Sequence, residues 1–573
     1  MASKTISLRA STVLVRPGCR QAPWLSLAVV RWALFGMLAW LLAASRPAGA
    51  AAPPEGPLAG EELLVPGWAG TKEEPVLAYD SDAGQYLLAW RFAGTGLPAI
   101  QAIRLLGTGQ PLDALPTPLS DPRPGEKGWP ALAYGGSSQG YLICWHYDSS
   151  GTGANWDIYC RFFHPGGQWS LGPELALADT RANEWRPALA RGGGSGAFLL
   201  AWNSSPPGAV EGIAGALVRH GQPPELSRFS VPECGLAQRH PALAYGAREG
   251  KFLLAWQRAQ PGGQEGSYDV YAALFDEAQA QIAEGPLALA AGPKDEARPV
   301  AGHFAGAGPY ILTWQAQYAG DDYDILAQLI GPNFVPLGAP LRIAFTIRPE
   351  LAAAVACNAT LPQCLVAWQE EEERGRGVIR ARHVYADGSL GPAFAIADSA
   401  QRSATMPAVA AGEGEYLVAW AAARPDEEPS EIRTRPVHAT YTFRGAAYHG
   451  QPGKPEVPLA GVQLQLLGDL DADPFGQGKA TVLAASTTAE DGTFSLSWEP
   501  DSQYPYYHVL RLEGPGEACT GMSLKSAFGA ASGPCTVTYA NLPPGLYAGI
   551  ESYALVAALL PHKVYLPLAL AGS

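Results

Sequence analysis

The sequence lacks the short motifs that usually mark an active site. Its ten histidines are scattered singly, and the HExxH, GxSxG and GxxxxGK[ST] patterns are missing. None of the eight cysteines has the CxxC spacing of a zinc site. We therefore predict no catalytic residues, no metal and no cofactor from the sequence.

Positive charge and long apolar runs are also scarce. The net charge of −14 argues against a nucleic-acid partner. The first fifty residues differ from the rest, because they hold six basic residues and no acidic one. The apolar run WALFGMLAWLLAA after Arg31 has 13 residues, whereas a membrane span needs about 20. Residues 1–50 are predicted to be a secretory signal cleaved near Ala50, with an uncleaved N-terminal anchor as the alternative. The mature chain would then be secreted or held at the cell surface, without a membrane span.

Cysteine is sparse, and its spacing suits local disulfides in an oxidising compartment. This prediction leaves Cys234 without a partner. The predicted pairs are Cys144–Cys160, Cys357–Cys364 and Cys519–Cys535.

Glycine, proline and aromatic residues are abundant instead, and they recur with a nearly fixed period. The chain holds 66 Gly, 51 Pro, 16 Trp and 23 Tyr. Segments like PALAYGAREGKFLLAW at 241–256 occur seven times, each ending in a tryptophan 52 to 58 residues after the previous one. Such periodicity indicates a repeat fold. The repeated tryptophans are Trp90, Trp145, Trp202, Trp256, Trp314, Trp368 and Trp420.

Each repeat contains four short strand candidates, which in the fourth copy are PALAY, KFLLAW, YDVYAALF and GPLALA. Four antiparallel strands per unit are what a propeller blade requires. The segment EELLVPG at 61–67 precedes the first repeat, and the seventh repeat stops after its third strand, near Val437. We therefore predict an all-β chain with a seven-bladed β-propeller at 58–437, closed by this N-terminal strand, with the tryptophans packed between blades.

Acidic and basic residues vary together between repeats at the predicted upper rim, the end where second strands lead into third strands. Where a third strand begins with Asp, an Arg precedes the next blade's proline; where it begins with Ala or Gly, no Arg does. We predict a carboxylate–guanidinium clasp between blades. The alternative is a ring of arginines that binds anions at the channel mouth. The pairs are Asp157–Arg186, Asp269–Arg298 and Asp324–Arg348.

Aromatic residues gather in the longer loops and crossings of the same rim. Loop-built rims are common binding surfaces, and aromatic side chains supply large contact areas. The alternative is that tryptophans entering from the crossings merely cover the repeat tryptophan beneath them. The predicted ligand-binding residues are Trp129, Tyr147, Trp156, Trp185 and Tyr268.

A different pattern begins after about Ala439. PLAGVQLQL, TTAEDGTFSL and LPPGLY follow in that order. This part resembles carboxypeptidase-regulatory-like and Cna-B-like β-sandwiches, which implies a spacer, stalk or adhesive module at 438–552, followed by a tail at 553–573. The repeats themselves are similar to the PAVAY…YLVVW…DIYGQR units of exported bacterial proteins, a resemblance that implies no settled activity. The S-x-D-x-G-x-T-W boxes of sialidases are missing.

The leading functional hypothesis is a non-enzymatic extracellular or cell-surface protein whose propeller binds a glycan or protein ligand. The alternative is a carbohydrate-active hydrolase or lyase with its site in the propeller channel. Two or three carboxylates converging in the channel would favour the enzyme. The predicted first strands, such as PALAY and PAVAA, are poor in acids and favour the binding platform.

Overall fold

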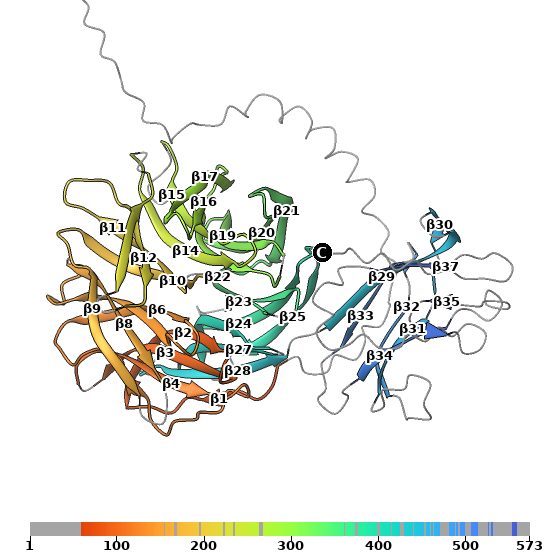
Figure 1. Cartoon of the computed structure of the whole chain (residues 1–573), viewed down its shortest axis with the longest axis horizontal. Coiled ribbons are helices and arrows are strands. Elements are labelled where there is room, and N and C mark those ends of the chain that lie inside the picture. The colour runs from red at the N-terminus through yellow and green to blue at the C-terminus, as the bar shows by residue number, and fades with distance from the viewer. Residues whose placement is uncertain are drawn as a thin grey trace, which may run out of the picture.

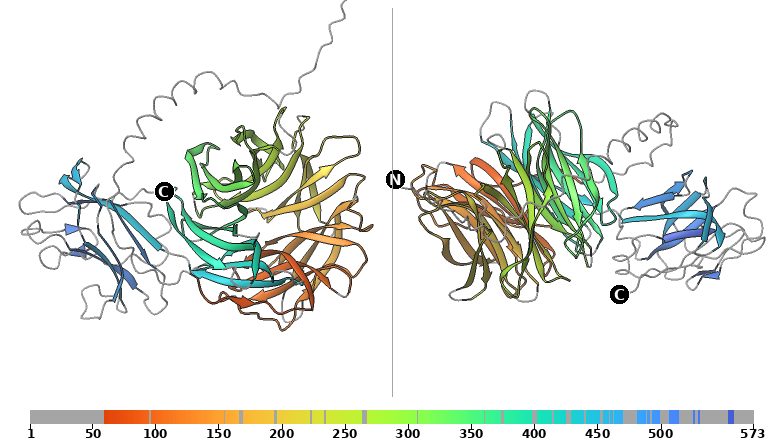
Figure 2. Two further views of the ribbon diagram at one scale, coloured as in Figure 1. Left: turned by 180° about the vertical axis from the view of Figure 1, so that it is seen from behind. Right: turned by 90° about the horizontal axis from the view of Figure 1, so that it is seen from above.

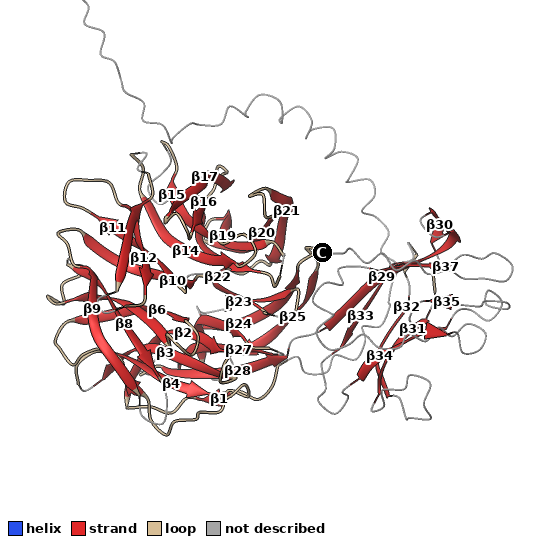
Figure 3. Cartoon of the chain, in the orientation of Figure 1, coloured by secondary structure: helices blue, strands red, loops and turns tan. Residues whose placement is uncertain are grey.

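The computed structural model describes residues 59–438 apart from short gaps, together with segments between 441 and 557. Every regular element in these residues is a strand (Figure 3). Within the described part, no helix is long and apolar enough to cross a membrane. The predicted signal, the tail, Cys234, Cys519 and Cys535 lie outside the described residues.

Seven four-stranded antiparallel sheets form the blades of a propeller. Blade 1 comprises β2 (Gly70–Asp80), β3 (Gln85–Gly94), β4 (Ala99–Leu105) and β5 (Thr117–Pro118). Blade 2 comprises β6 (Glu126–Tyr134), β7 (Tyr141–Asp148), β8 (Trp156–His164) and β9 (Ser170–Ala178). Blade 3 comprises β10 (Asn183–Arg191), β11 (Phe198–Ser205), β12 (Gly212–Arg219) and β13 (Glu225–Ser230), and blade 4 comprises β14 (Gln238–Gly246), β15 (Lys251–Ala259), β16 (Tyr268–Asp276) and β17 (Gln281–Ala290).

Blades 5 and 6 comprise β18 (Glu296–His303), β19 (Tyr310–Ala319), β20 (Asp322–Ile330) and β21 (Pro336–Ala344); and β22 (Glu350–Cys357), β23 (Gln363–Glu372), β24 (Arg376–Tyr385) and β25 (Leu390–Ala397). Blade 7 comprises β26 (Ser403–Ala411), β27 (Glu415–Ala423), β28 (Glu431–His438) and the N-terminal β1 (Leu63–Leu64).

The N-terminal strand closes the ring as the sequence predicts. Leu63 pairs with Thr434 of β28, and the main-chain N–H of Gly60 donates to the carbonyl of Pro436 at 2.8 Å. Figure 1 shows β1 beside β28, and Figure 2 shows the propeller from two further sides. The seventh sheet therefore joins the two ends of the repeat region.

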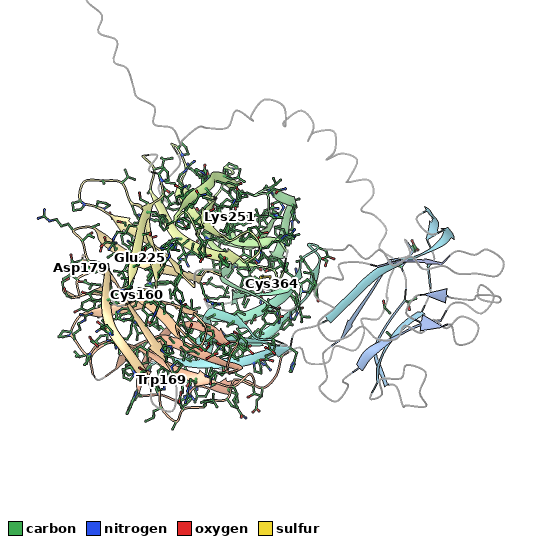
Figure 4. All side chains as sticks on the ribbon, viewed as in Figure 1. Cys160, Trp169, Asp179, Glu225, Lys251 and Cys364 are labelled. Carbon is green, nitrogen blue, oxygen red and sulfur yellow. A yellow bond between two sulfur atoms is a disulfide. The ribbon has the colours of Figure 1, made fainter. Side chains whose placement is uncertain are left out.

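The repeated tryptophans form the core between blades. Their second strands carry continuous apolar runs because both faces pack against neighbouring blades, and the tryptophans are at most 3% exposed. Figure 4 shows side chains throughout the blades. The predicted core role of these residues is confirmed.

A β-bulge interrupts the first strand of every blade. One non-glycine residue at each bulge has a positive φ of 48° to 55°. This conformation is costly for side chains other than glycine, so the surrounding structure must impose it. The residues are Glu74, Trp129, Arg186, His240, Arg298, Ala352 and Met406.

Two predicted disulfides are present. Cys144 and Cys160 face each other on β7 and β8 with Cα atoms 4.0 Å apart. Cys357 and Cys364 face each other on β22 and β23 at 3.9 Å. Figure 4 labels one cysteine of each pair.

Further strands follow the propeller: β29 (Tyr441–Gln451), β30 (Lys454–Pro458), β31 (Gln463–Asp469), β32 (Thr481–Thr487), β33 (Thr493–Trp498), β34 (Tyr506–Glu513), β35 (Lys525–Ser526), β36 (Gly529–Ala530) and β37 (Tyr553–Ala557). β29 pairs with β30, β33 and β37, and β31 pairs with β32 and β34. The β-sandwich assignment of this region stays a prediction.

Candidate functional site

The seven bulges place one side chain per blade around the upper mouth of the channel, and we call these seven residues the bulge ring. Arg186 of blade 3 interacts electrostatically with Glu74 of blade 1 and with Arg298 of blade 5. Interactions between blades that are not neighbours show that Glu74 and Arg298 both lie within electrostatic range of Arg186. We therefore treat the charged members of the ring as one candidate site.

Arg186 is the centre of the ring's contacts. Its Nη1 lies 2.7 Å from Nδ1 of His240, and its guanidinium carbon lies 3.7 Å from the centroid of the Trp129 ring. Burial and the neighbouring Arg298 lower the pKa of Arg186 to about 10, so it stays charged at neutral pH. Burial and Arg186 lower the pKa of His240 to about 3, so this imidazole is neutral and accepts from the guanidinium.

Glu74 provides the carboxyl group of the ring. It accepts a hydrogen bond from the main-chain N–H of Trp129 at 2.5 Å, and burial nevertheless raises its pKa. His146 lies beside it, buried, with its pKa lowered to about 3 by burial and by Arg186. A Cβ on Gly128 would lie 2.8 Å from Nε2 of His146 and 3.1 Å from Oε2 of Glu74, so only glycine allows this approach.

Side-chain amides after the repeat tryptophans hold the bulges in place. Oδ1 of Asn203 accepts from the N–H of His240 at 2.9 Å, and Oε1 of Gln257 accepts from the N–H of Arg298 at 2.9 Å. Gln315 bonds the N–H of Ala352 more weakly, at 3.3 Å. These residues were not predicted from the sequence, although the Trp-Asn or Trp-Gln dipeptide recurs at the end of the second strand in four repeats.

The predicted clasp is wrong. Among the described residues, none of the three predicted Asp–Arg pairs lies within ion-pair distance; the ion pairs of Arg348, for example, join it to Glu370 at 3.1 Å and to Glu372 at 3.3 Å. Arg186 instead contacts Trp129 and His240 of the two neighbouring blades, and Arg298 is exposed. In blade 6 the bulge residue is Ala352, so Arg348 is not equivalent to the other two arginines.

The acidic residues of the predicted clasp instead interact with glutamates of the next blade. Asp324 and Glu350 are 3% and 0% exposed, and the hydroxyl of Thr346 donates to Glu350 at 2.5 Å. Burial raises the pKa of Glu350 to about 7, with Asp324 adding to the shift. Each glutamate lies two residues before the bulge residue, which is an arginine in blades 3 and 5 and Ala352 in blade 6. The pairs are Asp157 with Glu184, Asp269 with Glu296, and Asp324 with Glu350.

The predicted aromatic residues separate into two groups. Trp129 belongs to the bulge ring, and Trp156 stacks on His146 with centroids 4.0 Å apart. Tyr147, which was predicted to bind a ligand, is 6% exposed and donates to the carbonyl of Pro124 at 2.7 Å, so it is not available at the surface. Its alternation along β7 turns it into the blade interface.

Trp185 and Tyr268 are half-buried. Trp185 pairs with Asn203 across β10 and β11. Tyr268 lies 5.9 Å from the guanidinium of Arg239, and its main-chain N–H donates to Asp295 at 2.8 Å. Neither is in the bulge ring. In the described residues, no three Asp, Glu, His or Cys side chains are grouped to hold a metal ion.

Comparison with known proteins gives likeness of fold only. No family model matches the chain, and no curated protein is similar to it. A thermostable family-43 glycoside hydrolase aligns with 49% of this chain and 97% of its own, at 15% identity and a TM-score of 0.31. Polysaccharide lyase Uly1 aligns with 65% of this chain and 90% of its own, at 10% identity and a TM-score of 0.39. Hadza microbial sialidase Hz136 aligns with 62% and 76%, at 9% identity and a TM-score of 0.38.

Proposed function

We propose that the upper mouth of the propeller binds an anionic glycan. One observation carries this proposal: Arg186 is held between Trp129 and His240, with Arg298 nearby, on a chain whose net charge is −14. Two guanidinium groups at one mouth favour a carboxylate or sulfate, which arginine binds in bidentate geometry.

The neighbouring groups suit a sugar ring better than a bare ion. Trp129 offers a flat apolar face, and Arg186 already occupies part of it by a cation–π contact. Glu74 is the one carboxyl group among the seven bulge-ring residues, so the ring repels an acidic ligand only weakly. Aromatic and arginine side chains in contact are typical anchors of a binding site.

The test is calorimetry of the secreted chain with oligoglucuronate and with a neutral glucan of equal length. We expect binding of the acidic oligosaccharide alone, and Arg186→Met should weaken it by about tenfold or more. Met406→Ala, in the same ring, is the matched control and should leave affinity unchanged. Equal affinity for both oligosaccharides, or an unchanged affinity in Arg186→Met, contradicts the proposal.

Cleavage of the bound glycan is a second candidate function, favoured by the raised pKa of Glu74 beside the neutral imidazole of His146, and by a second neutral imidazole, His240, in contact with Arg186. In an elimination, His240 would release its hydrogen bond from Arg186, and its ring nitrogen would take the proton next to the uronate carboxylate as a C=C bond forms. The glycosidic C–O bond would break, and the leaving oxygen would take a proton from Glu74. Ultraviolet absorbance of the new double bond tests this candidate. Glu74→Gln should abolish turnover while binding remains; a wild-type chain that binds without turnover refutes cleavage.

The remaining assignments accompany this proposal. Residues 58–437 form the binding domain, 438–552 a β-sandwich stalk, and residues 1–50 direct export. Mass spectrometry of the protein from the culture medium tests export, with a mature N-terminus after Ala50 as the expected result.

A further inference from the structure

A cavity lies between blades 5 and 6, and no bulge-ring residue lines it. Its volume is about 400 Å³, within the range of small-molecule sites. It is bounded by the outer strand β21, by the crossing that follows it, and by β23 and β24 of blade 6. The lining side chains used below are Arg342, Phe345, Trp368, Glu370, Arg380 and Arg382.

Arginines dominate the charged lining of this cavity. Glu370 is 3% exposed and neutralises Arg380 at 2.8 Å, and it also pairs with Arg348 at 3.1 Å. The guanidinium carbon of Arg342 lies 4.4 Å from the centroid of the exposed Phe345 ring. Positive charge therefore exceeds negative charge in the lining.

Arg382 carries the uncompensated charge. Its side chain is half-buried, and Nη1 donates to the carbonyl of Arg342 at 3.2 Å. In the described part of the chain it has no carboxylate at ion-pair distance, and burial lowers its pKa. A guanidinium removed from water without a counter-ion is costly.

Blade 2 has an arginine at the position equivalent to Arg382, and there the chain itself supplies a carboxylate. Arg161 lies opposite Ile143 as Arg382 lies opposite Val366, and it also donates to a main-chain carbonyl. In addition, Arg161 binds the carboxylate of Asp121 at 2.5 Å. The crossing between blades 5 and 6 has Phe345 after its outer strand, and it supplies Arg382 with no such carboxylate.

We propose that this cavity binds a small ligand bearing a carboxylate or sulfate, whose oxyanion takes at Arg382 the place that Asp121 takes at Arg161. Trp368 and Phe345 would contact the body of the ligand. This site is separate from the proposed glycan site and does not depend on it.

A matching cavity between blades 2 and 3 provides the control. Its volume is about 380 Å³, and it lies against Trp202 as the first lies against Trp368. Ala214 stands where blade 6 has Arg380, since both face the repeat tryptophan. Its Arg228 donates to the carbonyl of Leu177.

The experiment uses the full chain carrying Arg186→Met, so that the bulge ring does not contribute. Calorimetric titrations use D-glucuronate, inorganic sulfate and D-glucose. We expect saturable binding of one or both anions, with the two arms distinguishing an acidic sugar from a free sulfate, and no binding of glucose. Arg382→Met should reduce affinity by about tenfold or more.

Phe345→Asp is the second variant, because it supplies a carboxylate within the chain. It should abolish anion binding and raise the melting temperature, whereas Arg228→Met should leave binding unchanged. Absence of saturable anion binding, equal affinity in Arg382→Met, or an equal loss in Arg228→Met overturns the proposal.

Discussion

The bulge ring has two arcs with the same backbone and different chemistry. Blades 1 to 5 present Glu74, Trp129, Arg186, His240 and Arg298, whereas blades 6 and 7 present alanine and methionine. All seven residues have φ between 48° and 55°. The fold therefore requires a left-handed residue at each bulge and does not require that it be charged or aromatic.

This difference separates structural need from function. Ala352 and Met406 show that small or flexible apolar side chains satisfy the bulge. Arg186 and His240 on the other arc must bury polar atoms, which lowers the pKa of both residues. Retaining such groups where apolar residues suffice favours a binding role for the charged arc.

The largest expected effect concerns pH at the boundary between blades 5 and 6, just beyond the charged arc. The pKa of Glu350 is about 7 in the folded chain, above about 4.3 in the unfolded chain. The stability that its proton provides is complete below the unfolded pKa and is lost as pH rises through 7. We expect Glu350→Gln to stabilise the chain at pH 8 by about 1–3 kcal/mol and to have little effect at pH 4.

Denaturant unfolding at both pH values measures this effect. Thr346→Val is a useful companion, because it removes the hydroxyl donor but keeps the carboxyl group. If Glu350→Gln destabilises the chain equally at both pH values, the contribution of Glu350 does not depend on its ionisation and the prediction fails.

The next effect concerns the amide contacts within the charged arc. Asn203→Ala removes the acceptor of the His240 N–H, so we expect a loss of about 1–2 kcal/mol in stability. Gln315→Ala should cost less, because its hydrogen bond to the Ala352 N–H is longer. Thermal unfolding of both variants ranks the contacts. Equal losses would show that both arcs are held alike and would weaken the comparison.

The smallest effect tests the comparison itself. Arg298 is exposed on the charged arc, and methionine occupies the same position in blade 7. Arg298→Met should change the free energy of unfolding by less than about 0.5 kcal/mol. The same substitution should weaken binding of the acidic oligosaccharide. A large loss of stability would instead assign Arg298 to the fold.

The propeller could be predicted because its sequence repeats. The contacts of the side chains at the candidate site could be predicted only in part, because the repeat pattern does not give side-chain directions. The period of the tryptophans and the isolated segment at 61–67 led to the blades and to their closure. The two described disulfides followed from spacing across hairpins. Arg186 and Arg298 each lie at a bulge with positive φ and do not pair with the predicted aspartates, and no residue type in the sequence specifies that bulge.

Blade 6 shows a second limit of the sequence pattern. Pro349 resembled the proline of the other repeats, but the bulge falls at Ala352, and the proline position belongs to Ala353. The glutamates of the carboxyl pairs were missed because like-charged partners are not expected to face each other. Glu350 can lie beside Asp324 because burial raises the pKa of Glu350 and the hydroxyl of Thr346 donates a hydrogen bond to it. Neither feature is visible in the sequence.

The pairing of β1 with β28 sets the order in which the molecule can be assembled. Leu63 is made early, but its partner Thr434 is made only after all seven tryptophans. Blades 1 to 6 each pair strands that are neighbours in the chain, and both described disulfides lie within such hairpins. These units can therefore form as the chain emerges, whereas the channel and its mouth exist only after the last blade joins the first. Ligand binding at the mouth thus reports on a finished ring, and a chain that ends before β28 would have folded blades and no complete mouth.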